Sequence, residues 1–145
     1  MIQYPEIALR LFLAIFLGGL IGLERETAHK PAGLRTNILV CLGTTLFILV
    51  ALAAYDEYPE SPVDITRVAA GIIVGVGFLG GGTILRTDRD IHGLTSAATI
   101  WFVCGIGLAN GMGYYLLAVV SALLGFIVLR LVPLVERKFL QTRAK

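Results

Sequence analysis

Residues 36–54 read TNILVCLGTTLFILVALAA and contain no charged side chain. An α-helix rises 1.5 Å per residue, so roughly 20 apolar residues cross a hydrocarbon core about 30 Å thick. Thr36–Ala54 is therefore long enough for one crossing. Four further stretches are predominantly apolar, namely Ile7–Leu23, Val68–Leu85, Leu94–Ala109 and Met112–Leu129, and of these only the first contains a charged residue, Arg10. Because unpaired backbone polar groups are very costly in lipid, we expect each stretch to be helical.

The composition agrees with a membrane protein. The mean hydropathy is +0.83, and 15% of the 145 residues are charged, against about 25% in soluble domains. No linker or repeat divides the chain. We therefore expect a single transmembrane domain over residues 1–145, an all-α polytopic bundle of five helices with a basic tail at residues 130–145. The first stretch lacks the basic leader and small-residue cleavage site of a signal peptide, so it is expected to be retained.

Along the chain, the connections between the apolar stretches are alternately rich and poor in lysine and arginine. The first and third connections and the C-terminal segment are basic, whereas the second is acidic and the fourth has no basic residue. The basic residues of the three rich segments are Arg25, Lys30, Arg35, Arg86, Arg89, Arg130, Arg137, Lys138, Arg143 and Lys145. Positively charged connections stay in the cytoplasm. This pattern predicts five crossings with the N-terminus outside and the C-terminus inside.

The third apolar stretch is unusually rich in glycine. It contains the spacing G-x-G-x-x-G at Gly75, Gly77 and Gly80. A dinucleotide site needs that motif after a strand and within a βαβ unit, and a membrane-length helix does not supply this context. Small residues at helical spacing instead let backbones approach closely in lipid.

Glycine on two faces of this stretch predicts a central helix with close neighbours on both sides. The glycines expected in helix packing are Gly18, Gly22, Gly71, Gly75, Gly77, Gly80, Gly81 and Gly82. The run Gly80–Gly82 is costlier in a helix than packing requires. Two interpretations stay open, namely tight packing alone and a local break of the third helix.

Charged and polar residues gather where the apolar stretches meet the predicted cytoplasmic side. Glu24 or Glu26 is expected to pair with Arg35, because the short connection folds the first two helices into a hairpin. Thr36 is expected to cap the second helix. The full candidate cluster is Glu24, Arg25, Glu26, Arg35, Thr36, Asn37, Thr83, Arg86, Thr95 and Thr99. It could be a functional polar pocket or an interfacial network that only fixes topology.

No nucleophile–base pair and no H-E-x-x-H motif is present, so we expect no catalytic residue and no cofactor. Asp88, Asp90 and His92 could ligate a cation, but the arginines that alternate with them favour a solvated turn, so we expect no metal site. Cys41 and Cys104 are expected to be small buried apolar residues, and Arg10 is expected to reach the outer headgroups.

The expected partners are the lipid bilayer and another membrane protein, and self-association through glycine faces is compatible with the pattern. No nucleic-acid partner is indicated.

Four segments together resemble one family. They are Gly18-Gly-Leu-Ile-Gly22-Leu-Glu24-Arg25-Glu26, Ala32-Gly33-Leu34-Arg35-Thr36-Asn37, Gly77-Phe78-Leu79-Gly80-Gly81-Gly82-Thr83-Ile84 and Gly93-Leu94-Thr95-Ser96-Ala97-Ala98-Thr99-Ile100-Trp101. In this order, over residues 18–101, they are similar to the MgtC/SapB family of bacterial inner-membrane proteins.

This resemblance implies a multi-pass protein of the bacterial cytoplasmic membrane, linked to adaptation to low magnesium and to acid stress. Many members carry a further cytoplasmic domain with an ACT-like fold, and this chain is expected to correspond to the membrane domain alone. The resemblance favours a non-enzymatic regulator that binds another membrane protein. An ion or small-solute pathway, with Mg²⁺ as one candidate, is the alternative.

Overall fold

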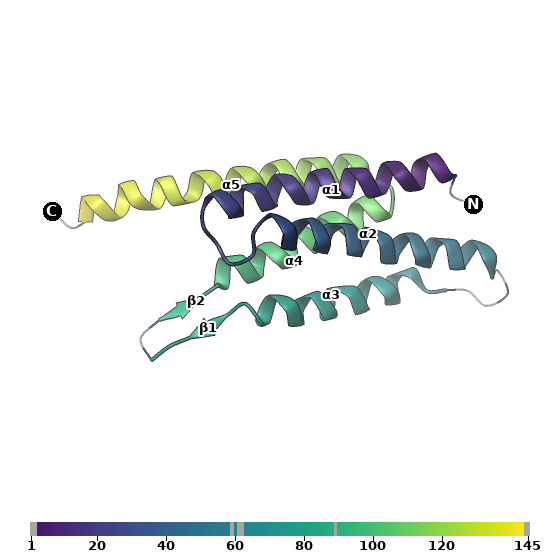
Figure 1. The fold of residues 1–145 in the computed structure, drawn as a ribbon, viewed down its shortest axis with the longest axis horizontal. Coiled ribbons are helices and arrows are strands. Elements are labelled where there is room, and N and C mark those ends of the chain that lie inside the picture. The colour runs from purple at the N-terminus through teal and green to yellow at the C-terminus, as the bar shows by residue number, and fades with distance from the viewer. Residues whose placement is uncertain (1–2, 59, 61–62, 89, 144–145) are drawn as a thin grey trace.

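The computed structural model describes residues 3–58, 60, 63–88 and 90–143. Within these residues it contains five α-helices and one two-stranded hairpin (Figure 1). The helices are α1 (Tyr4–Thr27), α2 (Leu34–Glu57), α3 (Ile65–Gly81), α4 (Leu94–Gly111) and α5 (Tyr115–Arg143). The antiparallel strands are β1 (Leu85–Arg86) and β2 (Ile91–His92). The expected helical fold is therefore confirmed, with a short hairpin added.

Four of the helices, α1, α2, α4 and α5, are long and apolar enough to cross a membrane. Helix α3 is apolar but has 17 residues, so at 1.5 Å per residue it is about 25 Å long. Helix α5 is longer than expected, because it continues through Pro133 to Arg143 instead of ending near Leu129. Although proline usually kinks or ends a helix, α5 continues past Pro133.

The burial pattern is that of a protein surrounded by an apolar medium. Large apolar side chains point outward, with Phe12 73% exposed and Phe78 83% exposed. In contrast, the side chains of Asn37 and Asn110 are completely buried. Water-soluble proteins rarely expose large continuous apolar areas, so this arrangement indicates that lipid covers the outer faces.

Helix α2 lies between α1 and α4, and both neighbours approach it through glycine. A Cβ atom at Gly18 or Gly22 of α1 would lie within 2.7–2.8 Å of the α2 backbone. A Cβ atom at Gly107 of α4 would lie 2.6 Å from the Cys41 carbonyl oxygen, and one at Gly111 would lie 2.8 Å from Ile48. Only glycine allows such close approach, so these positions hold three helices together.

The prediction that the glycine-rich third helix is central is wrong. Helix α3 lies at one edge, against α2 and α4 (Figure 1). A Cβ atom at Gly71, Gly75, Gly77 or Gly81 would meet nothing within 4 Å, whereas one at Gly80 would lie 3.2 Å from the Ala97 carbonyl oxygen. The sequence shows which backbones can approach closely, but it does not show which of them find a neighbour.

The glycine run ends α3 instead of breaking it midway. Gly82 is the C-cap, and Thr83 donates its amide and its hydroxyl to the Gly80 carbonyl at 3.0 and 2.8 Å. The predicted helix over Val68–Leu85 is therefore too long at its C-terminal end, because Leu85 belongs to β1. At the other end of the hairpin, Gly93 has φ +88°, and a Cβ there would lie 2.0 Å from the Thr83 carbonyl oxygen.

The two chain ends lie at opposite ends of the bundle (Figure 1). The α1–α2 connection, the β1–β2 hairpin and the C-terminal part of α5 share one end, which we call the hairpin end. The N-terminus and the α2–α3 and α4–α5 connections share the other, which we call the N-terminal end. Both groups of polar contacts described below lie near these two ends.

Candidate functional site

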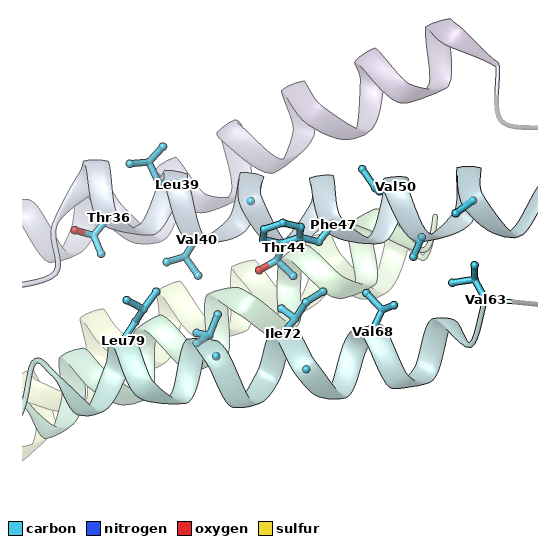
Figure 2. A pocket seen from close by; sticks show the side chains of 16 residues that line it. Thr36, Leu39, Val40, Thr44, Phe47, Val50, Val63, Val68, Ile72 and Leu79 are labelled. Atoms are coloured by element: carbon cyan, nitrogen blue, oxygen red, sulfur yellow. The ribbon is translucent and has the colours of Figure 1, made fainter. Parts of the chain in front are cut away.

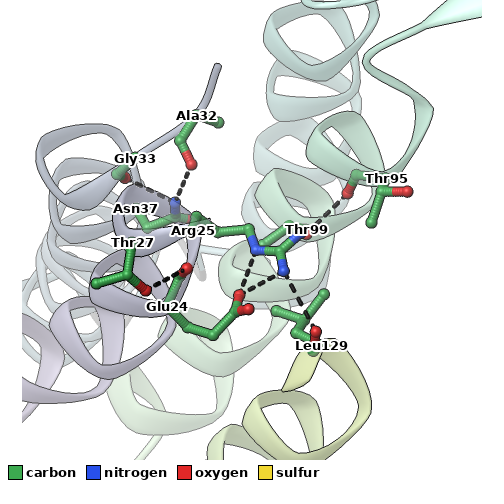
Figure 3. Close-up of polar contacts among 9 residues, drawn as sticks. All are labelled: Glu24, Arg25, Thr27, Ala32, Gly33, Asn37, Thr95, Thr99 and Leu129. Atoms are coloured by element: carbon green, nitrogen blue, oxygen red, sulfur yellow. Dashed lines mark hydrogen bonds and ion pairs between the residues drawn. The ribbon is translucent and has the colours of Figure 1, made fainter. Parts of the chain in front are cut away.

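A buried ion pair lies at the hairpin end, where α1 meets α5. Glu24 and Arg25 are 5% and 2% exposed, and they pair with each other. Figure 3 shows the Arg25 guanidinium between the Glu24 carboxylate and the Leu129 carbonyl oxygen, to which its Nη2 donates at 3.4 Å. Pro133 lacks the amide that would normally bond to the carbonyl four residues earlier, so it leaves the Leu129 oxygen available to Arg25.

Glu26 closes the α1–α2 connection. Its Oε2 accepts from the Leu34 amide at 2.9 Å and so satisfies a donor at the start of α2. The predicted pairing of Glu24 or Glu26 with Arg35 is therefore wrong. Arg35 is exposed. Thr36 is exposed as well, and it is not the helix cap, because Gly33 occupies the N-cap position.

Asn37 holds the same connection from inside the bundle. Its Nδ2 donates to the carbonyl oxygens of Ala32 and Gly33 at 2.9 and 2.8 Å (Figure 3). The Oδ1 atom of Asn37 is buried, and the part of the chain that the structure describes offers it no hydrogen-bond partner. An unpaired buried oxygen is rare, since it costs free energy.

The remaining members of the predicted cluster do not join this group directly. Thr99 donates its hydroxyl to the Thr95 carbonyl at 2.7 Å, so this bond lies within α4. Thr83 bonds to the end of α3, and Arg86 is exposed on β1. The structure thus divides the predicted cluster into an α1–α2 part, an α4 part and a hairpin part.

A cavity of about 480 Å³ opens beside the Glu24–Arg25 pair, and we call it the hairpin-end cavity. Thr95 of α4 also lines it. The other charged residues of its wall are Lys30, Arg130 and Glu136. Sequence reasoning did not place these three in the site, because α5 meets the α1–α2 connection only in the folded bundle.

A second polar network, at the N-terminal end, was not predicted as a site. Arg10 is 6% exposed and forms an ion pair with Glu6. It donates to the Tyr115 hydroxyl at 3.0 Å and to the Gly111 carbonyl oxygen at 2.6 Å. The prediction that Arg10 reaches outward to the headgroups is wrong, because the α4–α5 turn supplies acceptors inside the protein.

Asn110 extends this network across three helices. Its Nδ2 donates to the Arg10 carbonyl oxygen at 2.7 Å and to Thr45 Oγ1 at 3.1 Å. Thr45 in turn donates to the Gly107 carbonyl oxygen at 3.0 Å. The available signal in the sequence was Arg10 within the first apolar stretch, because a charged residue at membrane depth is a functional candidate by default. Asn110 gave no such signal, because it lies in the short connection between the fourth and fifth stretches.

A cavity of about 870 Å³, larger than the hairpin-end cavity, is a groove between α2 and α3, which we call the α2–α3 groove. Figure 2 shows Val40, Thr44 and Phe47 of α2 facing Ile72 and Leu79 of α3. Glycines also line both walls, and a Cβ atom at Gly43, Gly71 or Gly75 would meet nothing within 4 Å. The groove is thus apolar and unfilled by the chain's own side chains.

Cys41 and Cys104 are buried and unpaired, as predicted. Within the described ranges, no group of three or more His, Cys, Asp or Glu side chains is placed to hold a metal ion.

Comparison with known proteins shows which family the chain is related to. A model of the MgtC family matches residues 11–138, which include both polar clusters except Glu6 and Arg10. The chain belongs to the MgtC family. The family resemblance found in the four sequence segments is therefore confirmed.

Among similar family members, Protein SapB of Bacillus subtilis is 42% identical over 92% of this chain. Protein MgtC of Salmonella typhimurium is 44% identical over 79% of the chain, and the Putative magnesium transporter YhiD of Escherichia coli is 39% identical over 86%. The matched region spans 60%, 47% and 59% of those three relatives. No solved structure matches the chain.

Proposed function

We propose that this MgtC family chain is a non-enzymatic protein of the bacterial cytoplasmic membrane that binds another membrane protein. Through that partner it modulates membrane transport or energetics under magnesium limitation or acid stress. The observation that carries the proposal is the α2–α3 groove, because it offers an apolar surface with open glycines inside the expected bilayer region.

The proposed arrangement has five crossings, with the N-terminus outside and the hairpin end in the cytoplasm. The opposite positions of the two chain ends support an odd number of crossings (Figure 1). Helix α3, about 25 Å long, is slightly shorter than a hydrocarbon core of about 30 Å, and a short helix is accommodated by local thinning of the bilayer. The alternation of basic residues between connections supports the direction.

The dimensions and lining of the groove fit a transmembrane helix of the partner. On α2 the lining runs from Thr36 to Ala54, which corresponds to about 27 Å along a helix. Small residues line both walls, including Gly43 on one side and Gly71 and Gly75 on the other. Helix association in lipid depends on such close backbone approach. The partner helix is expected to present small residues of its own toward these glycines.

Filling the groove tests the proposal. Gly75→Leu adds a side chain inside the groove, whereas Gly77→Leu adds the same side chain on the same helix outside the lining. Both positions have open space around the new Cβ, so both variants are expected to fold. Each is expressed in a strain lacking the chromosomal gene, and growth in low magnesium is measured. We expect Gly75→Leu to lose function and Gly77→Leu to keep it.

A photoreactive amino acid in place of Phe47, whose side chain lines the groove, reports the occupant in living cells. We expect one discrete adduct with another membrane protein, abolished by Gly75→Leu and kept in Gly77→Leu. Adducts with lipid alone, or with a second copy of the chain alone, would contradict the proposal. Full function of both leucine variants would contradict it as well.

A cation or small-solute pathway is the second candidate, favoured by the name of the YhiD relative and by the charged cavity at the hairpin end. Purified protein in liposomes would then carry Mg²⁺ faster than empty vesicles do. Flux equal to that of empty vesicles would leave partner binding as the function.

A further inference from the structure

The hairpin-end cavity has two kinds of wall. Lys30 of the α1–α2 connection and Arg130 of α5 bring positive charge, and both side chains are exposed and able to reach a ligand. Leu129, Pro133 and Leu134 of α5 make an apolar wall. We propose that this cavity is a binding site for an anionic phospholipid, with its phosphate near Lys30 and Arg130 and its acyl chains along α5.

The charge balance favours an anion. Glu24 and Arg25 neutralise each other in their buried pair. The charged groups left in the wall are Lys30, Arg130 and Glu136, so the cavity has a net positive charge. Lysine and arginine near a membrane surface attract anionic headgroups. The Glu136 carboxylate repels an anionic headgroup, so its removal is expected to strengthen lipid binding.

The buried pair also shapes the cavity. Arg25 is fixed by Glu24 and by the Leu129 carbonyl oxygen, so its guanidinium forms a rigid floor between α1 and α5. The oxygen of Leu129 is available for this contact because Pro133 has no amide hydrogen. The positively charged end of the site is therefore formed by Arg25 of α1, Lys30 of the α1–α2 connection and Arg130 of α5, and not by a flexible tail.

The cavity lies at the depth of a headgroup. The part of α5 that is long and apolar enough to cross a membrane runs from Tyr115 to Glu136, which is about 32 Å along the helix against a hydrocarbon core about 30 Å thick. The cavity residues between Leu129 and Glu136 lie in the last two turns of that span, from which the long side chain of Arg130 can reach the headgroups. Below it, Leu124, Ile127 and Val128 are exposed and available to acyl chains. A soluble phosphate would use the cations alone, whereas a lipid also covers the apolar wall and these side chains. This difference favours the lipid.

The inference requires that the helices span a membrane, but it does not depend on partner binding in the α2–α3 groove. The test therefore measures lipid retention and not growth. The full chain is purified in detergent and titrated with phosphatidylglycerol or phosphatidylcholine, and bound lipid is counted by native mass spectrometry. We expect tighter binding of phosphatidylglycerol, weakened by added salt.

The combined variant Lys30→Ala with Arg130→Ala is expected to weaken phosphatidylglycerol binding about thirtyfold, or about fivefold for each cation. The matched control, Arg35→Ala with Arg86→Ala, removes two exposed cations from the same end and is expected to change binding less than twofold. Both pairs alter exposed side chains, so folding is expected to be preserved. Glu136→Gln is expected to tighten binding.

Equal retention of the two lipids would overturn the inference, and so would equal weakening by the test and control variants. Glycerol 3-phosphate, added at the same concentration as the lipid, distinguishes the two sources of phosphate. Failure to displace phosphatidylglycerol supports the lipid site. Complete displacement would overturn the assignment to a lipid.

Discussion

At the scale of single residues, the same amino acid has different roles at different positions. Gly18 and Gly22 lie in contact with the backbone of α2, whereas Gly71 and Gly75 have open space around them. Sequence spacing alone could not separate the two groups, because both occur at helical intervals. The difference depends on which helix lies opposite, and therefore on the fold.

Replacing Gly22 by alanine should separate α1 from α2, since the new Cβ would lie 2.8 Å from the Leu34 Cα atom. We expect a loss of about 1–3 kcal/mol, the usual cost of overpacking, and a lower unfolding midpoint in detergent. Gly71→Ala is the control, and it should leave the midpoint unchanged or raise it, because alanine favours a helix more than glycine does. Equal midpoints for the two variants would contradict the packing described.

Buried polar residues were predicted less well than apolar ones. Arg10 was placed at the surface by its position near a helix end, but the fold supplies it with Tyr115 and the Gly111 carbonyl more than 100 positions later. Partners that distant in sequence are fixed only by the packing of α1 against α4 and α5. The same reason explains why Lys30 and Arg130 were not connected to Glu24.

At the scale of elements, the apolar stretches predicted each helix, but the ends were less exact. Hydropathy locates the region that can lie in lipid, whereas the end of a helix depends on capping. Helix α2 begins at Leu34, two residues before the prediction, because Glu26 from α1 satisfies its first amide. Helix α3 stops at Gly81, because three glycines and a threonine favour a turn there.

Asp64 caps the start of α3, and its side chain provides a pH-dependent element. The Thr66 hydroxyl and the Arg67 amide donate to Asp64, and these bonds hold the pKa of the carboxyl below its usual value. A lowered pKa in the folded state means that the cap contributes stability above the ordinary carboxyl pKa. That contribution is lost as the pH falls through the lowered value.

We expect the amides of Thr66 and Arg67 to exchange faster with solvent at acidic pH, after correction for the intrinsic pH dependence. Asp64→Ala should give the faster exchange at every pH. Asp64→Asn should keep the protection and remove its pH dependence, because asparagine caps a helix without titrating. Hydrogen exchange followed by NMR in detergent measures this, and a wild-type profile that does not change with pH would rule out the role of Asp64.

At the scale of the whole molecule, α2 is joined backbone to backbone with α1 and α4, α5 packs against α1 and α4, and α3 lies at the edge. The helical class and the number of helices followed from composition and hydropathy. The order of packing did not, since every stretch is apolar and can lie against any other. The position of the α2–α3 groove therefore could not be predicted from the sequence, although two of its glycines, Gly71 and Gly75, were predicted to lie at helix contacts.

The proposed orientation makes a prediction for the entire chain. Reporter fusions at Glu60, in the α2–α3 connection, should be active in the periplasm, and fusions at Thr87, in the hairpin, should be active in the cytoplasm. A fusion at Lys145 should also report the cytoplasm, because the C-terminal part of α5, described up to Arg143, lies at the hairpin end (Figure 1). Periplasmic activity of the fusion at Lys145 would exclude five crossings with the N-terminus outside.

The edge position of α3 has a mechanical consequence. The glycine contacts that tie α1 and α4 to α2 leave those three helices little room to move, whereas α3 has open space beside several of its glycines. Its C-terminal end leads directly into the β1–β2 hairpin. A sideways displacement of α3 would therefore also displace the β1–β2 hairpin, whereas the three helices joined through glycine would keep their arrangement.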